Sequence, residues 1–344
     1  MNFITNNTMK RINVILANLT VIGLMTGCGG GSGSGNNNDK NEIKSEPGIT
    51  MTRQEAGEIK IRLCGDGAAT INWGDDSPTD SVKLKTESET DFTHNYAQAG
   101  NYTIKITNPA ITKCECLENN LTSIDVSNSP ALTVLDVSKN QLTSIDVSNN
   151  PNLNELQFYK NQLTEINVSK NPALKLLNAE NNKLTSLDVS NNTALEKLYC
   201  GLNNLTSLDV SKNTLLIRID CGNNELLPSI DVSSNTALSV LECAKSELTS
   251  IDVSKNPNLT SLYMWGSNKL TDIVAGDNPH LMSVVLTKCQ LSAQTLNNLF
   301  ETLHSNDMKS SGCSIEKNIY IDGNPGMNDC KKSIAEKKGW TIKE

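Results

Sequence analysis

A 21-residue unit repeats through the middle of the chain and constrains the fold more than any other feature. The stretch LTSIDVSNNPNLNELQFYKNQ, residues 142–162, is followed by LTEINVSKNPALKLLNAENNK and by LTSLDVSNNTALEKLYCGLNN. The leucines expected to open the units are Leu121, Leu142, Leu163, Leu184, Leu205, Leu226, Leu248, Leu270 and Leu291. Self-similarity at a short fixed period indicates a solenoid, in which each coil packs only against its neighbours.

Each unit carries two apolar segments that we expect to line opposite walls of a coil. In the segment LNELQFYKNQL, Leu153, Leu156 and Phe158 have the alternate spacing of a strand with one buried face. In LTSIDVS, Ile145 and Val147 are expected to point inward from the other wall. A single coil has too few apolar side chains to offset the entropy of ordering its backbone, so stacking is part of the stability.

An asparagine recurs in the turn that follows the first segment. Its buried amide is expected to pair backbone groups that the turn leaves free. The expected column is Asn119, Asn140, Asn161, Asn182, Asn203, Asn224 and Asn268, with Ser246 and Cys289 replacing two members. The unit L-x-x-L-x-(V/C)-x-x-N-x-L-T-x-(I/L)-D-V-S-x-N-x-x resembles the leucine-rich repeat family, specifically its short bacterial class of nested 21-residue repeats. The resemblance covers residues 113–290 and implies about nine strands in a β-rich, formally α/β, right-handed superhelix.

The first 28 residues have the features of an export signal. Lys10 and Arg11 precede an apolar run at 14–25 that is too short to span a membrane. The run ends in MTGC, which resembles a bacterial lipobox and implies lipid attachment at Cys28; a plain signal peptide stays the alternative. Residues 29–46 have the composition of a flexible tether. We therefore expect a surface-exposed protein of the outer membrane that contacts the membrane only through its lipid anchor.

Residues 47–112 alternate with period two and are expected to form a small β-sandwich. The segments INWGDDSPTDSV and FTHNYAQAGNYTIKI resemble the PKD-type, immunoglobulin-like domain. The matching residues are Trp73, Gly74, Asp75, His94, Tyr96, Gly100, Tyr102 and Ile104. The unit is near the lower size limit for an independent core, so we expect it to fold against the repeats. Asp75 and His94 are expected to bond the turns rather than to ligate a metal.

Residues 291–344 are expected to form a C-terminal cap of βαβ type. AQTLNNLFETLHS has apolar residues at helical spacing, NIYIDGNPG reads as a strand and turn, and DCKKSIAEKKGWTIK reads as a helix and a final strand. Such a cap would cover the open end of the solenoid. Cys313 and Cys330 lie outside the repeats, and a disulfide between them stays open.

The other cysteines follow the repeat. Cys116, Cys200, Cys221 and Cys243 occupy a strand position that Val137, Phe158 and Ala179 fill elsewhere, so we expect them to be small buried apolar residues. The CEC motif at 114–116 has no nearby histidine or further cysteine, which argues against a metal.

Composition excludes several functional classes. The net charge is −8 with no Lys/Arg stripe, which argues against a nucleic-acid partner. The three histidines are scattered, and no nucleophile motif, metal-spaced cluster or phosphate loop is present in the sequence. We therefore expect neither enzyme activity nor a cofactor, although a glycosidase carboxylate pair stays open. The aspartates of the DVS segments (Asp125, Asp146, Asp188, Asp209, Asp231, Asp252) leave calcium as a further alternative.

The remaining place for function is the solvent face of the main sheet. Its residues vary from unit to unit while the inward residues recur, and it carries several of the aromatic residues, which make up only 4% of the chain. The expected ligand-binding residues are Gln157, Tyr159, Tyr199, Asp220, Glu242, Tyr263 and Trp265. Exposed aromatic residues on a rigid platform favour a protein partner in adhesion or protein binding. A glycan ligand, a structural spacer and simple cross-strand pairing stay as alternatives.

Overall fold

The computed structural model describes residues 47–307, 309–310, 313–314 and 316–344. The predicted signal peptide, Cys28 and the tether at 29–46 lie outside the described residues. The described residues belong to one compact unit. Within the described part of the chain, no helix has both the length and the apolar character that crossing a membrane requires.

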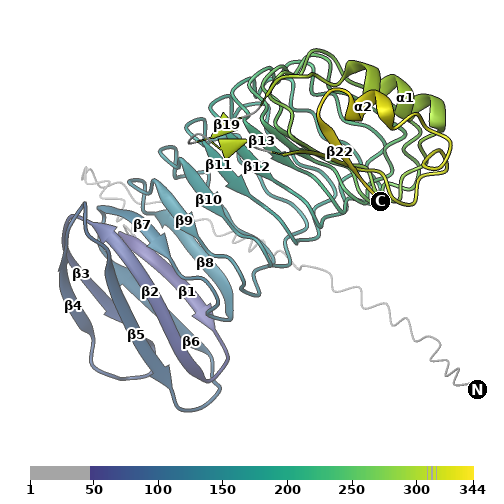
Figure 1. The fold of residues 1–344 in the computed structure, drawn as a ribbon. Coiled ribbons are helices and arrows are strands. Elements are labelled where there is room, and N and C mark those ends of the chain that lie inside the picture. Colours follow the sequence, from purple (N-terminus) through teal and green to yellow (C-terminus); the bar gives the residue numbers. More distant parts are fainter. Residues whose placement is uncertain (1–46, 308, 311–312, 315) are drawn as a thin grey trace, which may run out of the picture. The chain divides into compact units, whose positions relative to one another are not determined.

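A parallel sheet of short strands runs along the repeats, one strand from each coil (Figure 1). The central residue of each three-residue strand is buried and its two neighbours are partly exposed or, at Asp136, just buried. The strands are β7 (Ile111–Glu115), β9 (Val134–Asp136), β10 (Glu155–Gln157), β11 (Leu176–Asn178), β12 (Lys197–Tyr199), β13 (Arg218–Asp220), β14 (Val240–Glu242), β16 (Ser261–Tyr263) and β18 (Ser283–Val285). Two strands on another wall, β15 (Ser250–Asp252) and β17 (Asp272–Val274), pair with each other.

The register corrects two of the expected inward positions. Leu226 is 59% exposed and Leu227 is fully buried, because the sixth coil contains one additional residue. Asn268 is exposed, and Ser267 takes the expected place in the buried column. The Ser267 hydroxyl donates to the Cys243 carbonyl at 3.2 Å. A one-residue insertion shifts the next inward-pointing position by one residue along the chain. Where two adjacent residues both suit that position, as Leu226 and Leu227 do, only one of them can point inward.

The other predicted asparagines form the buried column as expected. Asn161 donates from Nδ2 to the Val137 and Phe158 carbonyls, both at 3.0 Å, and accepts from the Leu142 N–H at 3.0 Å. Asn119 instead bonds both the N–H and the carbonyl of Lys60 in the N-terminal strands. Each amide thereby joins neighbouring parts of the backbone.

A second buried asparagine column was not assigned from the sequence. Its members follow the DVS segment, have at most 3% exposure, and are Asn150, Asn171, Asn192, Asn213, Asn235, Asn256 and Asn278. Asn192 donates to the Val168 carbonyl at 2.9 Å and to the Asn171 carbonyl at 2.8 Å. The recurring Asn of DVSxN was the available signal for this column.

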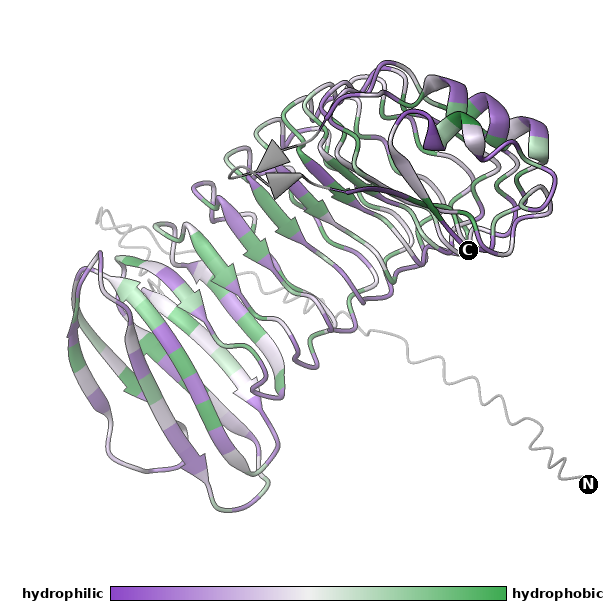
Figure 2. Cartoon of the chain, in the orientation of Figure 1, coloured by the Kyte–Doolittle hydropathy of each residue, from purple (hydrophilic) through white to green (hydrophobic). Residues whose placement is uncertain are grey.

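The N-terminal strands form two antiparallel layers that both continue into the first coil. One layer ends on β8 (Leu121–Asn128), which pairs with β1, and the other pairs β2 with β7. Figure 2 shows the alternation of hydrophobic and hydrophilic residues along these strands. The strands are β1 (Gly48–Arg53), β2 (Gly57–Gly65), β3 (Gly67–Asn72), β4 (Asp80–Leu84), β5 (Thr90–Tyr96) and β6 (Tyr102–Thr107). His94 Nε2 lies 2.7 Å from Asp75 Oδ2, beside Trp73.

The C-terminal residues extend the same parallel sheet. Strand β21 (Lys317–Tyr320) pairs with β18, and β22 (Trp340–Lys343) pairs with β21. The remaining elements are α1 (Ala293–Thr302), β19 (Lys309–Ser310), β20 (Cys313–Ser314) and α2 (Ser333–Glu336). Ser292 caps α1 by accepting from the Thr295 N–H. Cys330 is buried. The side chain of Cys313 lies outside the described residues, so the disulfide between the two stays a prediction.

Candidate functional site

The outer face of the sheet holds all seven residues expected to bind a ligand. Successive strand residues point to opposite sides, so the residues flanking each buried central leucine, isoleucine or valine point outward. All seven are partly exposed: Gln157, Tyr159, Tyr199, Asp220, Glu242, Tyr263 and Trp265. Tyr320 joins them, because its strand pairs in register with Val285 of β18. Four of the six tyrosines of the chain therefore lie on this face.

Part of the face carries small, buried residues rather than a row of exposed side chains. Gly201, Gly222 and Ala244 occupy outward positions on three adjacent coils and are buried. A Cβ atom at Gly201 would lie 2.9 Å from the Gly222 carbonyl oxygen, so the close packing of these coils requires glycine. Ser138 occupies the equivalent position of an earlier coil and is also fully buried.

Three carboxylates, Asp220, Glu180 and Glu242, lie on the same part of the face as these small residues. Burial raises the pKa of Asp220, and burial followed by the charge of Asp220 raises the pKa of Glu180 and of Glu242. Arg218 partly compensates this charge, since its Nη2 lies 3.7 Å from Glu242 Oε2. Its guanidinium carbon also lies 5.4 Å from the centre of the Tyr199 ring. Arg218 and Glu180 were not among the predicted site residues, although both belong to outward positions of the repeat.

We expect the variant Asp220→Asn to be more stable than the parent chain at pH 7. The raised pKa means that the native state holds the proton more tightly than the unfolded chain, whose Asp titrates near about 3.9. The parent therefore gains stability as the pH falls through the folded pKa, and the difference between the two proteins closes near about pH 4. Thermal unfolding between these pH values measures this difference.

A matched control is Asp209→Asn on another wall. Hydrogen bonds from the Ser211 N–H and hydroxyl lower the pKa of Asp209, so its ionised form does not oppose folding. We expect Asp209→Asn to give no stabilisation at any pH. Equal melting temperatures for Asp220→Asn and the parent at pH 7 would contradict the proposed burial cost.

The aromatic residues of the face are held by neighbouring charged groups. The Lys245 ammonium lies 4.6 Å from the centre of the Trp265 ring. Gln157 donates to Glu155 at 2.6 Å within its own strand. Such contacts position the rings while leaving part of each ring accessible.

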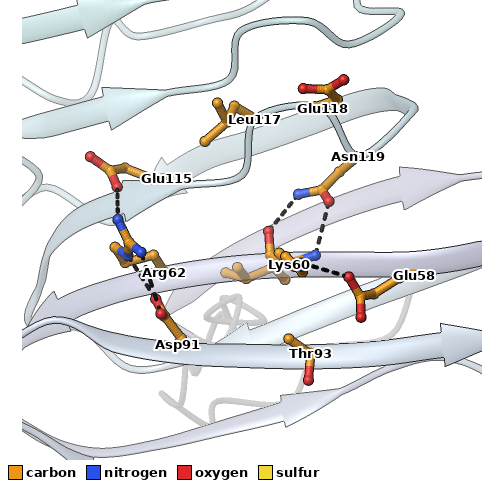
Figure 3. A pocket seen from close by; sticks show the side chains of 10 residues that line it. Glu58, Lys60, Arg62, Asp91, Thr93, Glu115, Leu117, Glu118 and Asn119 are labelled. Carbon is orange, nitrogen blue, oxygen red and sulfur yellow. Dashed lines mark hydrogen bonds and ion pairs between the residues drawn. The ribbon is translucent and has the colours of Figure 1, made fainter.

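Two hollows adjoin the outer face. The first, about 580 Å³, lies where β7 meets β2 and β5 (Figure 3). Its charged groups are largely paired: Arg62 bonds Asp91 at 2.6 Å and Glu115 at 3.4 Å, and Lys60 lies 2.8 Å from Glu58. The second hollow, about 740 Å³, contains Trp265.

The aspartates considered for calcium are used within the backbone turns. Asp125, Asp146, Asp188, Asp209, Asp231 and Asp252 each accept the N–H of the serine two residues later. Hydrogen bonds from Ser148 and Ser190 lower the pKa of Asp146 and Asp188. Among the residues that the structure covers, no group of three or more His, Cys, Asp or Glu is arranged to hold a metal ion.

The repeat cysteines lie in the core as expected. Cys116, Cys200, Cys221 and Cys243 have no solvent exposure, and the Cys221 and Cys243 sulfurs are 2.9 Å apart. Burial raises the pKa of Cys200, and the contact with Cys221 together with burial raises that of Cys243. The thiols of Cys200 and Cys243 are therefore protonated at neutral pH and are poor nucleophiles or metal ligands.

Comparison with solved structures places the fold among leucine-rich repeat proteins. The functional domain of InlJ from Listeria monocytogenes, described as including a cysteine ladder, is 30% identical, with a TM-score of 0.56 over 66% of this chain and 47% of that one. A leucine-rich repeat protein of Leptospira interrogans, LIC12759, is 20% identical, with a TM-score of 0.52 over 64% of this chain and 56% of that one.

The chain spans about half the length of these two proteins. Comparisons with family models and with curated proteins gave no match. The parallel strands, their in-register pairing and these two structural similarities all indicate the same solenoid architecture. The stacked coils of this chain form a solenoid with the fold of leucine-rich repeat proteins.

Proposed function

We propose that this chain is a non-enzymatic cell-surface protein that binds another protein through the outer face of its sheet. The observation that carries the proposal is a set of three partly exposed tyrosines: Tyr199 and Tyr263 lie on strands of one sheet, and Tyr159 follows strand β10 of the same sheet by two residues. Rigid aromatic side chains bury a large area for little loss of entropy, and they dominate the energetics of protein interfaces.

The carboxylates beside these tyrosines indicate the character of the partner. Asp220 lies on β13, which pairs with the Tyr199 strand β12, and Glu242 lies one strand further along, on β14. A partner that places a lysine or arginine beside these two carboxylates would relieve their mutual repulsion. The proposal is therefore an aromatic binding surface that favours a partner with a basic patch.

Further proposals concern the membrane anchor, the cellular location and the terminal units of the protein. We propose that Cys28 is the lipid-attachment site, that the protein is displayed at the outer membrane, and that residues 47–112 are a PKD-like unit. The support for the anchor and the membrane is the sequence pattern of residues 1–46. We further propose that the N-terminal strands and the C-terminal elements act as caps, since each continues the sheet beyond the repeats.

Affinity capture from bacterial and host extracts tests the proposal. We expect the parent chain to retain a specific protein that the triple variant Tyr159→Ala, Tyr199→Ala, Tyr263→Ala fails to retain. Truncating a buried interface aromatic costs about 2 kcal/mol or more, so three changes suffice to abolish capture. The matched control is Lys212→Ala with Lys255→Ala, two exposed residues outside this face. Retention of the same protein by the triple variant would exclude the outer face.

A further inference from the structure

The second hollow, here called the Trp265 hollow, differs from the first in what its side chains offer. It is lined by Trp265 together with Leu226, Lys245, Asn268, Thr287 and others. The three tryptophans of the chain all lie among the described residues, and Trp73 and Trp340 have only 1% and 2% exposure. Trp265 is thus the one tryptophan kept partly exposed, and it lines a hollow.

Four polar side chains that line the hollow with Trp265 make no hydrogen bond within the described residues. In the described part of the chain, the side chains of Asn268, Thr287 and Lys288 have no hydrogen-bond partner, and neither has Glu225. The register of the repeat explains why the Asn268 amide lies at the hollow. Ser267 fills the buried column, so the side chain of Asn268 stays outside that column. An amide, a hydroxyl, an ammonium and a carboxylate therefore surround one indole ring.

We propose that the Trp265 hollow binds a hexose ring of an oligosaccharide. A pyranose has an apolar face of C–H groups that packs on an aromatic ring, and a rim of hydroxyl groups that both donate and accept hydrogen bonds. The free groups of the hollow match that rim. An apolar side chain of a protein partner would instead desolvate these groups without pairing them, which costs affinity.

The neighbouring contacts fit this role. Lys245 lies against the indole through its ammonium, 4.6 Å from the ring centre, and limits the orientations of the ring. Glu247 is paired with Lys269, so its charge is already compensated. This binding site is separate from the tyrosines proposed to bind a protein, because none of Tyr159, Tyr199 and Tyr263 lines the hollow.

The test is binding of the full chain to a panel of immobilised glucans, mannans, galactans and sialylated oligosaccharides. We expect the parent to bind at least one of them, Trp265→Ala to bind it about tenfold more weakly or worse, and Asn268→Ala to bind it several-fold more weakly. Tyr159→Ala, outside the hollow, should bind the sugar as the parent does. Because Trp73 and Trp340 are buried, the sugar should change the tryptophan emission of the parent through Trp265.

Three outcomes would overturn the proposal. The first is a parent chain that binds no member of the panel at millimolar concentration. The second is sugar binding that Asn268→Ala leaves unchanged. Asn268 is exposed, so its replacement does not unfold the chain, and the Asn268→Ala result tests the proposal even if Trp265→Ala is unstable. The third is a Trp265→Ala variant that binds the sugar as the parent does and loses only the binding of a protein partner. Loss of protein capture by the tyrosine variant, with sugar binding intact, would leave the sugar site standing.

Discussion

Removal of residues 1–110 is expected to abolish cooperative folding of the rest of the chain. The deletion takes away β1 and β2, which pair with β8 and β7 of the first coil. It also exposes Leu121 and Val126, which have no solvent exposure in the intact chain. An open sheet edge beside exposed apolar residues is a site of aggregation, and a solenoid without its end unit is poorly soluble.

Thermal unfolding and light scattering of two truncated chains measure this effect. The control fragment, 47–344, keeps every residue that the structure describes and should melt as the parent does. The fragment 111–344 should associate or unfold without a sharp transition. A monomeric 111–344 fragment with the melting temperature of 47–344 would show that the coils fold without the N-terminal strands and would contradict this prediction.

The second large effect is expected at the asparagine column that follows the DVS segments. Asn192→Ala removes two buried hydrogen bonds, to the Val168 and Asn171 carbonyls, and leaves a small cavity. At about 1 kcal/mol for each bond, with a further contribution from the cavity, we expect the free energy of unfolding to fall by about 2–3 kcal/mol.

The adjacent Asn191→Ala provides the control, because Asn191 is exposed and makes no hydrogen bond through its side chain within the described residues. Asn191→Ala should change the free energy of unfolding by no more than about 0.5 kcal/mol. Urea unfolding compares the two variants with the parent. Equal midpoints for the two variants would mean that the buried amides do not hold neighbouring coils together.

The repeat made most of the solenoid predictable. Leu153, Leu156 and Asn161 recur at a fixed spacing, and the physical requirement that each coil present the same surface to its neighbours fixes their orientation. Prediction failed where the period changes: near Leu226 and Asn268, two adjacent residues both suit the inward position, and only the paired register of the sheet distinguishes them. The merging of the N-terminal strands with the first coil depends on pairings between distant segments, which local patterns do not encode.

The candidate site was predictable in part for the same reason. The alternation of strand residues identified the outward positions that carry Tyr159 and Trp265. It did not show that Gly201 and Gly222 are buried, because their burial depends on how closely the coils approach one another. Arg218 was missed because its contacts reach a different coil, and Tyr320 because its strand follows the last repeat.

The dissociation constant of the captured protein partner tests the central claim most directly. It should be measured for the parent chain, for the triple tyrosine variant and for the Lys212→Ala, Lys255→Ala control. We predict that the triple variant binds about 100-fold more weakly or worse, and that the control binds as tightly as the parent. A triple variant that is folded and binds with the affinity of the parent would contradict the assignment of the outer face as the binding surface.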